Sequence, residues 1–310
     1  MAPKLRYEAI KPTMKTFAFL FFALMAVTMH GQDAYLQDRI DSLAKIGRMV
    51  LEHPESAVRD SMNRKFRQRL KQIVQTEKGY KASLSEVTNM SALSGENFRI
   101  FTWQVPDKNY HYTRYGLVAA ERRRGIRLTE LKDQKSNIPR VDFRRLRSDE
   151  WLGALYYQII PLKDKRKKVY TLLGYASGPE INKKVVEIIE VRNNGTVKFG
   201  DKRFYVDQFN DQTYKSAPMR LILRYSSQYT ASVRWHPDED LIIMDHCAPP
   251  RDELKGAYSY YGPDFSYNGL YWKDGWWHLE ENPEFNTGQN NPIVPPNRPL
   301  GLPPSQANEN

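Results

Sequence analysis

The stretch Phe98-Arg99-Ile100-Phe101-Thr102-Trp103 marks the point at which the hydrophobic pattern of the chain changes to a period of two. Successive side chains of a strand point to opposite faces of its sheet, so this alternation predicts a strand. Further short runs rich in β-branched and aromatic residues follow, and we interpret each as a strand. They are Tyr110–Leu117, Leu155–Pro161, Val169–Leu173, Val185–Val191, Leu221–Tyr225, Ser232–Trp235 and Leu241–Met244.

Turn signals separate several of these runs. They lie at 106–109, 163–168, 194–195, 237–240 and 273–275. Asn194-Gly195 is the strongest of them, because Asn and Gly accept the positive φ that a tight hairpin turn requires. Consecutive hairpins predict an antiparallel meander over residues 81–290, and no alternation of strands with helices indicates a parallel sheet. The chain is therefore expected to be mainly β.

A long antiparallel sheet twists and exposes its edges, so one of about ten to twelve strands tends not to stay open. We therefore expect the meander to close into a barrel or to fold over as a sandwich. A propeller is not favoured, because the sequence shows no self-similarity at a period of about 40–50 residues.

The segment 32–80 has a helical rather than a strand period. Apolar residues recur every third or fourth position from Leu36 to Val50 and again from Val58 to Val74, with His53-Pro54 between the two runs. Proline is tolerated in the first turn of a helix, so the pattern predicts a helical hairpin of residues 34–52 and 55–77. Its outer face carries six basic residues, and we interpret them as a polyanion-binding stripe or as an ordinary solvated face. They are Arg59, Arg64, Lys65, Arg67, Arg69 and Lys71.

The N-terminal 31 residues have the layout of a secretory signal peptide. Lys15 precedes the apolar run Phe17–Val27, and a short polar segment ends at Gln32. Charged, apolar and small-residue regions in this order direct export, and we expect translation to start at Met14. The alternatives are an unusually long basic leader and a membrane anchor, although the run falls short of the roughly 20 apolar residues that span a bilayer. No cysteine lies near the cleavage region, which argues against a lipoprotein.

Charge and cysteine content agree with a protein of the cell envelope. The chain has a formal net charge of +11, of which residues 1–31 contribute +3, so the exported part keeps +8. Such a surplus favours polyanions, which in the envelope are phosphorylated lipids and acidic glycans rather than nucleic acid. The single cysteine, Cys247, is expected to be buried and inert. Residues 291–310 are rich in proline and predict an extended or disordered tail.

Aromatic residues concentrate in the segment Gly256–Glu280. Side chains with an apolar ring and a polar edge can stack on sugars, and interleaved Asp and Asn could bind the hydroxyl groups. The same rings could instead fill the core of the sheet. The candidate ligand-binding residues are Tyr260, Tyr261, Asp264, Tyr271, Trp272 and Trp276, of which Trp272 and Trp276 flank the turn at 273–275.

The sequence contains no specific catalytic, cofactor or metal motif. Asp245-His246-Cys247, together with His236, matches no zinc spacing, and we interpret the group as a strand end with a satisfied histidine. Neighbouring strand residues face opposite sides, which also argues against His246 and Cys247 as a catalytic pair. We predict no cofactor and no metal. If the protein is instead a glycan hydrolase, its paired carboxylates come from four candidates: Asp245, Asp264, Glu280 and Glu281.

Four segments together resemble a set of exported proteins of the Bacteroidetes. They are FRIFTWQVP (98–106), ALYYQIIPLKDKRKKVYTLLGY (154–175), LIIMDHCAPP (241–250) and YSYYGPDFSYNGLYWKDGWWHLEE (258–281). The resemblance runs from about residue 83 to residue 281 and rests mainly on the aromatic turn at 260–265. It implies an envelope protein of a Gram-negative cell and assigns no catalytic residue.

These observations lead to one functional hypothesis and one alternative. We expect an exported, non-enzymatic protein of the periplasm or outer envelope that binds a polymer or a partner protein, such as an envelope glycan or another envelope protein. No nucleic-acid partner and no transmembrane segment in the mature chain are expected. The alternative is an envelope glycan hydrolase, which would need two carboxyl groups at a defined separation across a cleft.

Overall fold

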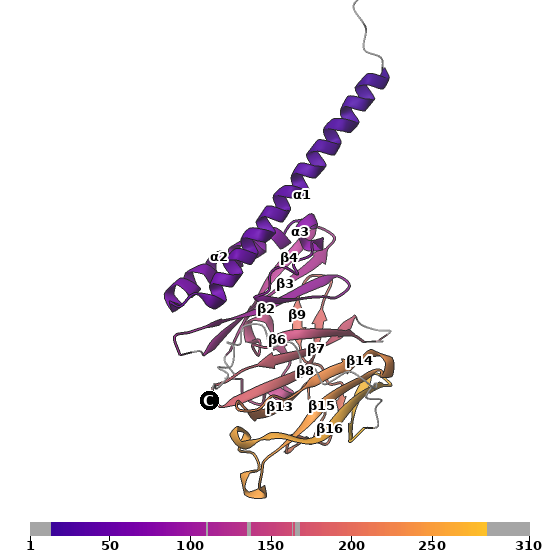
Figure 1. Cartoon of the computed structure of the whole chain (residues 1–310). Helices are drawn as coiled ribbons and strands as arrows, with labels where there is room; N and C mark the ends of the chain where they lie inside the picture. The colour runs from indigo at the N-terminus through magenta and orange to yellow at the C-terminus, as the bar shows by residue number, and fades with distance from the viewer. Residues whose placement is uncertain (1–13, 110, 135–137, 163, 165–167, 284–310) are drawn as a thin grey trace, which may run out of the picture.

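The computed structural model describes residues 14–109, 111–134, 138–162, 164 and 168–283, with side chains from residue 33 onward. The chain begins with helices and continues almost entirely as strands (Figure 1). The predicted tail at 291–310 lies outside the described residues, as do the side chains of the predicted signal peptide.

Helices α1 (Met14–Glu52) and α2 (Ser56–Val74) form the predicted hairpin, and the short helix α3 (Glu77–Lys81) follows. The backbone of the segment 14–32 continues α1 beyond the sheets (Figure 1). The two helices separate at 53–55, where Pro54 cannot supply the amide hydrogen that a continuous helix needs. Side chains described as buried begin at Ile40 in α1, and Leu36 is partly buried.

The first sheet has four antiparallel strands in the order in which they occur in the chain. They are β1 (Met90–Ser94), β2 (Phe98–Pro106), β3 (Tyr112–Arg122) and β4 (Gly125–Lys132). The predicted alternation at the start of β2 is confirmed, because Phe101 and Trp103 pack with the helices while Phe98 and Ile100 pack with the next sheet.

The second sheet is the central one. Its strands are β5 (Leu146–Arg147), β6 (Leu155–Pro161), β7 (Val169–Ala176), β8 (Ile181–Val191), β9 (Val197–Phe199) and β13 (Arg220–Ser226). The order is β5-β9-β8-β7-β6, and β13 pairs with the first part of β8. The hairpin predicted at Asn194-Gly195 joins β8 to β9, and Gly195 has a φ of +79° there.

The third sheet contains β10 (Phe204–Tyr205), β14 (Val233–His236), β15 (Leu241–Ala248), β16 (Gly262–Lys273) and β17 (Trp276–Glu281). Its order is β10-β17-β16-β15-β14. The two-residue strand β10 pairs with β17 in parallel, which the predicted meander did not include. A separate ribbon pairs β11 (Gln208–Phe209) with β12 (Gln212–Thr213), and 3₁₀ turns lie at 141–143, 148–150, 237–239, 252–254 and 258–260.

Three hydrophobic cores join these elements into successive layers (Figure 1). One core lies between the helical hairpin and the first sheet, where Phe66 meets Trp103. A second lies between the first and second sheets and includes Trp151 and Tyr156, and the third lies between the second and third sheets around Trp277. Both faces of the first and second sheets, and one face of the third sheet, are therefore covered by a neighbouring layer.

The mainly β class, the antiparallel sheets and the N-terminal helices are confirmed. No sheet in the described residues closes into a barrel, and the predicted closure into a barrel or sandwich is not confirmed. The physical reason is that the strands are divided among separate sheets, so apolar faces are buried by stacking rather than by curling of one long sheet. Within the part described with side chains, no helix has the length and hydropathy of a membrane span.

Candidate functional site

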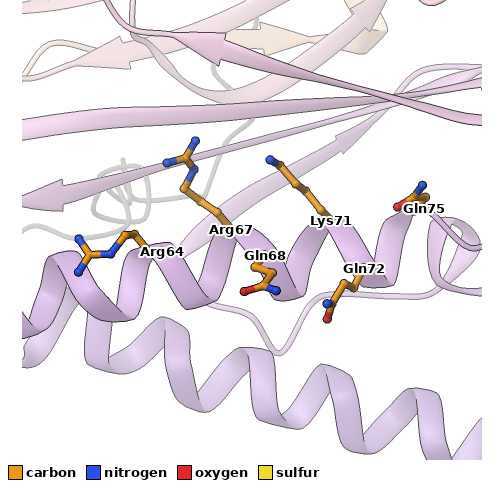
Figure 2. A pocket seen from close by; sticks show the side chains of 6 residues that line it. All are labelled: Arg64, Arg67, Gln68, Lys71, Gln72 and Gln75. Carbon is orange, nitrogen blue, oxygen red and sulfur yellow. The ribbon is translucent and has the colours of Figure 1, made fainter.

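A hollow of about 350 Å³ lies along one side of α2 (Figure 2). Arg64, Arg67 and Lys71 supply its positive charges, and they recur at helical spacing on a single side of the helix. Amide side chains occupy the positions between and beyond them. The full lining is Arg64, Arg67, Gln68, Lys71, Gln72 and Gln75. We call this feature the basic hollow.

The position of the basic hollow follows from how α2 is buried. The apolar residues Phe66, Leu70 and Ile73 turn one side of the helix onto the first sheet, and each is almost fully buried. Residues three or four positions apart lie on a common side of a helix, so the polar positions of α2 are left toward solvent. The amphipathic pattern that packs one side of α2 against the first sheet therefore also places the cations of α2 on the accessible side.

Glu130 on β4 organises the basic hollow from the edge of the first sheet. One of its carboxylate oxygens, Oε1, accepts from Arg67 at 2.9 Å and from Lys71 at 2.6 Å. Burial alone would raise the pKa of Glu130, but the hydrogen bonds from Lys71 and Arg67 outweigh it and the pKa is lowered. The carboxylate is therefore charged and holds both cations in place.

The electrostatic balance of the basic hollow is positive. Arg64, Arg67 and Lys71 line it, the Glu130 carboxylate pairs with Arg67 and Lys71, and the glutamine side chains add neutral donors and acceptors. The guanidinium of Arg67 also lies 5.5 Å from the centre of the Tyr115 ring, which limits how far it can swing. Guanidinium and ammonium groups arranged in this way suit carboxylate, sulfate or phosphate groups of a ligand.

The predicted basic stripe is wrong at one of its six positions. Arg59 is 6% exposed, so it is not on the outer face. Its guanidinium donates to the carbonyl oxygens of His53, Pro54, Pro106 and Asp107. The sequence pattern counted Arg59 as a surface charge. In the structure its guanidinium instead links the helical hairpin to the end of β2. Lys65 is exposed and Arg69 half-buried, and neither lines the basic hollow.

Three of the six predicted aromatic-segment residues lie at the start of β16. Tyr260 is 56% exposed, whereas Tyr261 is fully buried. The Tyr261 hydroxyl donates to Asp211 Oδ2 at 2.7 Å and accepts from the amide of Gly256 at 2.7 Å. Asp264 is partly exposed and lies 2.8 Å from Nδ1 of His246.

The other three predicted residues lie at the far end of β16 and the start of β17. Tyr271 is half-buried opposite His278. The Trp272 ring packs edge-on against Trp277 at 5.3 Å, while Trp276 is 37% exposed. The regular strand from Tyr267 to Trp272 alone rises about 17 Å, and Asp264 lies beyond its start. The structure therefore does not bring the six residues together into one site.

The segment Asp245-His246-Cys247 lies at an irregularity of the third sheet, where the register between β15 and β16 shifts. Asp245 accepts from the amide of Ser232 at 2.7 Å, and His246 contacts Asp264. Cys247 is 2% exposed, and burial, followed by the nearby Asp245 and Asp264 carboxylates, raises its pKa. The thiol is therefore protonated and enclosed.

Other carboxylates also have separate roles. Glu187 is fully buried and paired with Arg220 at 2.9 Å, and Glu190 pairs with Arg192 at 2.8 Å on the other side of the strand. Residues three apart on a strand point to opposite faces, so the two carboxylates do not converge. No group of three or more His, Cys, Asp or Glu side chains in the described part of the chain could hold a metal ion.

Sequence reasoning missed two charged residues with distinct environments. Glu130 is one, because nothing local to it shows that β4 lies beside α2. Lys184 is the other: it is 5% exposed, and its ammonium lies 5.1 Å and 5.0 Å from the ring centres of Tyr157 and Tyr175. Burial is the main cause that lowers its pKa to about 8, and the Asp245 carboxylate opposes this effect.

We compared the chain with protein-family models, with curated proteins and with solved structures, and none of the three comparisons gives a match.

Proposed function

We propose that this protein is a non-enzymatic protein of the cell envelope that binds an anionic polymer through the basic hollow on α2. The observation that carries this proposal is the convergence of Arg64, Arg67 and Lys71 on one accessible side of the helix. The same side carries three glutamines, whose amide groups can bind the hydroxyl and carbonyl groups found between the acidic groups of such a polymer.

The shape of the basic hollow favours a chain over a small molecule. Its lining runs from Arg64 to Gln75, and 11 residues of helix rise about 17 Å. This length exceeds a single sugar or phosphate unit, so repeated acidic groups can meet successive cations. The net charge of +8 that remains without residues 1–31 supports attraction of polyanions at longer range.

Export of the protein to the periplasm or outer envelope is part of the same proposal. The apolar run Phe17–Val27 supports it. Leu36 is the first residue of α1 described as packing against the core, and Asp33 and Tyr35 are exposed. Cleavage near Gln32 would therefore leave every described core contact of α1 in place.

The alternative of a glycan hydrolase receives less support from the geometry. Such an enzyme needs two carboxyl groups facing across a cleft. None of Asp245, Asp264, Glu280 and Glu281 lines the basic hollow. Asp245 accepts a hydrogen bond from the amide of Ser232, whereas Asp264 contacts His246, so the two aspartates have separate partners. We therefore favour binding over hydrolysis.

Binding to immobilised polyuronate and polyphosphate, with neutral dextran as the control polymer, tests the proposal. We expect the protein to bind both polyanions at low salt and to release them as salt rises. Arg64→Gln combined with Lys71→Gln should weaken binding at least tenfold. Lys65→Gln removes an exposed charge of the same helix outside the basic hollow and should have a small effect. Equal losses for the double variant and Lys65→Gln, or no binding at all, would contradict it.

A further inference from the structure

A bulge in the third sheet carries an exposed aromatic ring. Asp245 pairs with Tyr267 and Cys247 pairs with Pro263, so the three residues between them on β16 stand opposite the single residue His246. The three residues are Asp264, Phe265 and Ser266. Bulges of this kind re-aim side chains and occur next to binding and catalytic sites.

Hydrogen bonds between residues of the bulge stabilise its conformation. His246 Nδ1 lies 2.8 Å from Oδ2 of Asp264, and Ser266 donates to Oδ1 through its amide at 3.1 Å and its hydroxyl at 2.7 Å. Burial alone would raise the pKa of Asp264, but the hydrogen bonds from Ser266 and His246 outweigh it and the pKa is lowered. The carboxylate is thus charged and fixed, and it retains lone pairs for a further donor.

Phe265 is the middle residue of the bulge, and both its backbone conformation and the exposure of its ring are energetically unfavourable. Its φ is +67°, a left-handed conformation that strains a bulky residue. Its side chain is 92% exposed, so the ring gains nothing from burial. Within the described structure neither cost is offset by a contact of the ring. A bound partner that covers the ring would offset both.

Two more exposed rings belong to segments that adjoin the first residues of β16. Tyr260 is 56% exposed and Tyr229 is 51% exposed. The ring of Tyr229 covers Gly262, since a Cβ atom there would lie 3.0 Å from it. The loop that carries Tyr229 is tied to the same place, because the amide of Ser226 donates to the carbonyl of Tyr261 at 2.9 Å. We call Tyr229, Tyr260 and Phe265 the aromatic bulge surface.

We propose that the aromatic bulge surface is a second binding site, for a neutral glycan. Flat rings pack against the C–H faces of pyranoses, and the Asp264 carboxylate with the tyrosine hydroxyls offers partners for the sugar hydroxyls. The chemistry differs from that of the basic hollow, because the exposed charges of the preceding loop balance: Arg251 and Lys255 are positive, and Asp252 and Glu253 are negative. An acidic ligand gains no net attraction here.

This inference goes beyond the proposed function and does not depend on it. The aromatic bulge surface belongs to the third sheet, and the first and second sheets lie between that sheet and α2 (Figure 1). It also differs from the site predicted from the sequence, which included Tyr271, Trp272 and Trp276 at the far end of β16. Only Tyr260 of the residues predicted from sequence contributes a ring to it, and Asp264 contributes its carboxylate.

The test is calorimetric titration with chitohexaose, cellohexaose and maltohexaose, comparing the wild-type protein with Phe265→Gly. Glycine accepts a φ of +67° without strain, so we expect Phe265→Gly to raise the melting temperature by roughly 2–4 °C. The same substitution should weaken binding of at least one hexasaccharide tenfold or more. Trp276→Ala, which removes an exposed ring elsewhere on the sheet, should leave that binding unchanged.

Three results would overturn the proposal. The first is no binding of any of the three hexasaccharides by the wild-type protein. The second is equal binding by the wild-type protein and Phe265→Gly. The third is loss of glycan binding on Trp276→Ala but not on Phe265→Gly, which would return the site to the turn at 273–275. Co-sedimentation with phosphatidylcholine vesicles that depends on Phe265, without glycan binding, would assign the surface to lipid and overturn the proposal as well.

Discussion

The ring of Phe66 on α2 meets the indole of Trp103 on β2 edge-on, with the ring centres 5.3 Å apart. The indole nitrogen of Trp103 also donates to Oδ1 of Asn63 at 2.8 Å, so an apolar and a polar contact fix the helix at the same place. Both rings are buried. The helical hairpin is therefore part of the folded body rather than a separate arm, and this sets where the basic hollow lies.

The first prediction concerns this contact. Phe66→Asp places an unpaired charge in the core and should destabilise the protein by about 2–4 kcal/mol. Lys65→Asp, at the neighbouring exposed position, introduces the same carboxylate and should change stability by less than about 0.5 kcal/mol. Urea denaturation of the three proteins measures the difference. Similar curves for wild type and Phe66→Asp would mean that the hairpin does not share the cooperative unfolding of the sheets.

The second prediction uses the buried ammonium of Lys184, whose pKa is lowered to about 8 mainly by burial. Below this pH the lysine is protonated in both states, and burying the charge opposes folding. Between about pH 8 and pH 10.4 the folded state loses the proton while the unfolded state keeps it, so stability rises with pH.

Lys184→Met removes the charge and keeps most of the side-chain volume. The variant should be more stable than the wild-type protein at pH 7, and its advantage should shrink by about 2 kcal/mol by pH 9.5. Denaturation curves at the two pH values give this difference directly. An advantage that is constant with pH, or a variant less stable than the wild-type protein at pH 7, would show that Lys184 is not buried as a charge.

The third prediction concerns the N-terminus of the mature protein. We expect it near Gln32, and N-terminal sequencing of the protein recovered from the periplasmic fraction measures this. A protein that begins at Gln32 should have the same urea midpoint as one that keeps residues 14–31, because Asp33 and Tyr35, next to the expected cleavage site, are exposed. Recovery of intact Phe17–Val27 in the membrane fraction would instead support an anchor.

Much of the fold could be predicted from local pattern, and particular residues show where the pattern was insufficient. The alternation from Phe98 to Trp103 identified both faces of β2, and Asn194-Gly195 identified the hairpin between β8 and β9. The division into three sheets depends on which strands pair over long distances, as when β13 joins β8, and no local period encodes that choice.

The candidate sites show the same limit. The cations of α2 could be recognised from spacing alone, but burial of Arg59 and the contact of Glu130 with Arg67 and Lys71 depend on tertiary structure. The aromatic segment was recognised from its composition. Which ring is exposed depends on a bulge at Phe265, where a phenylalanine adopts the left-handed conformation, and Gly262, three positions earlier, does not mark it.

The central claim is that the basic hollow binds an anionic polymer, and the most direct test is the affinity of Glu130→Gln for polyphosphate. Glu130 now neutralises part of the charge of Arg67 and Lys71. Its removal should free both cations and tighten binding by on the order of 1 kcal/mol, or several-fold, at low salt. The stability of the protein should change little, because exposed ion pairs contribute only about 0–1 kcal/mol. Unchanged or weaker binding of polyphosphate by a folded Glu130→Gln protein would contradict the claim.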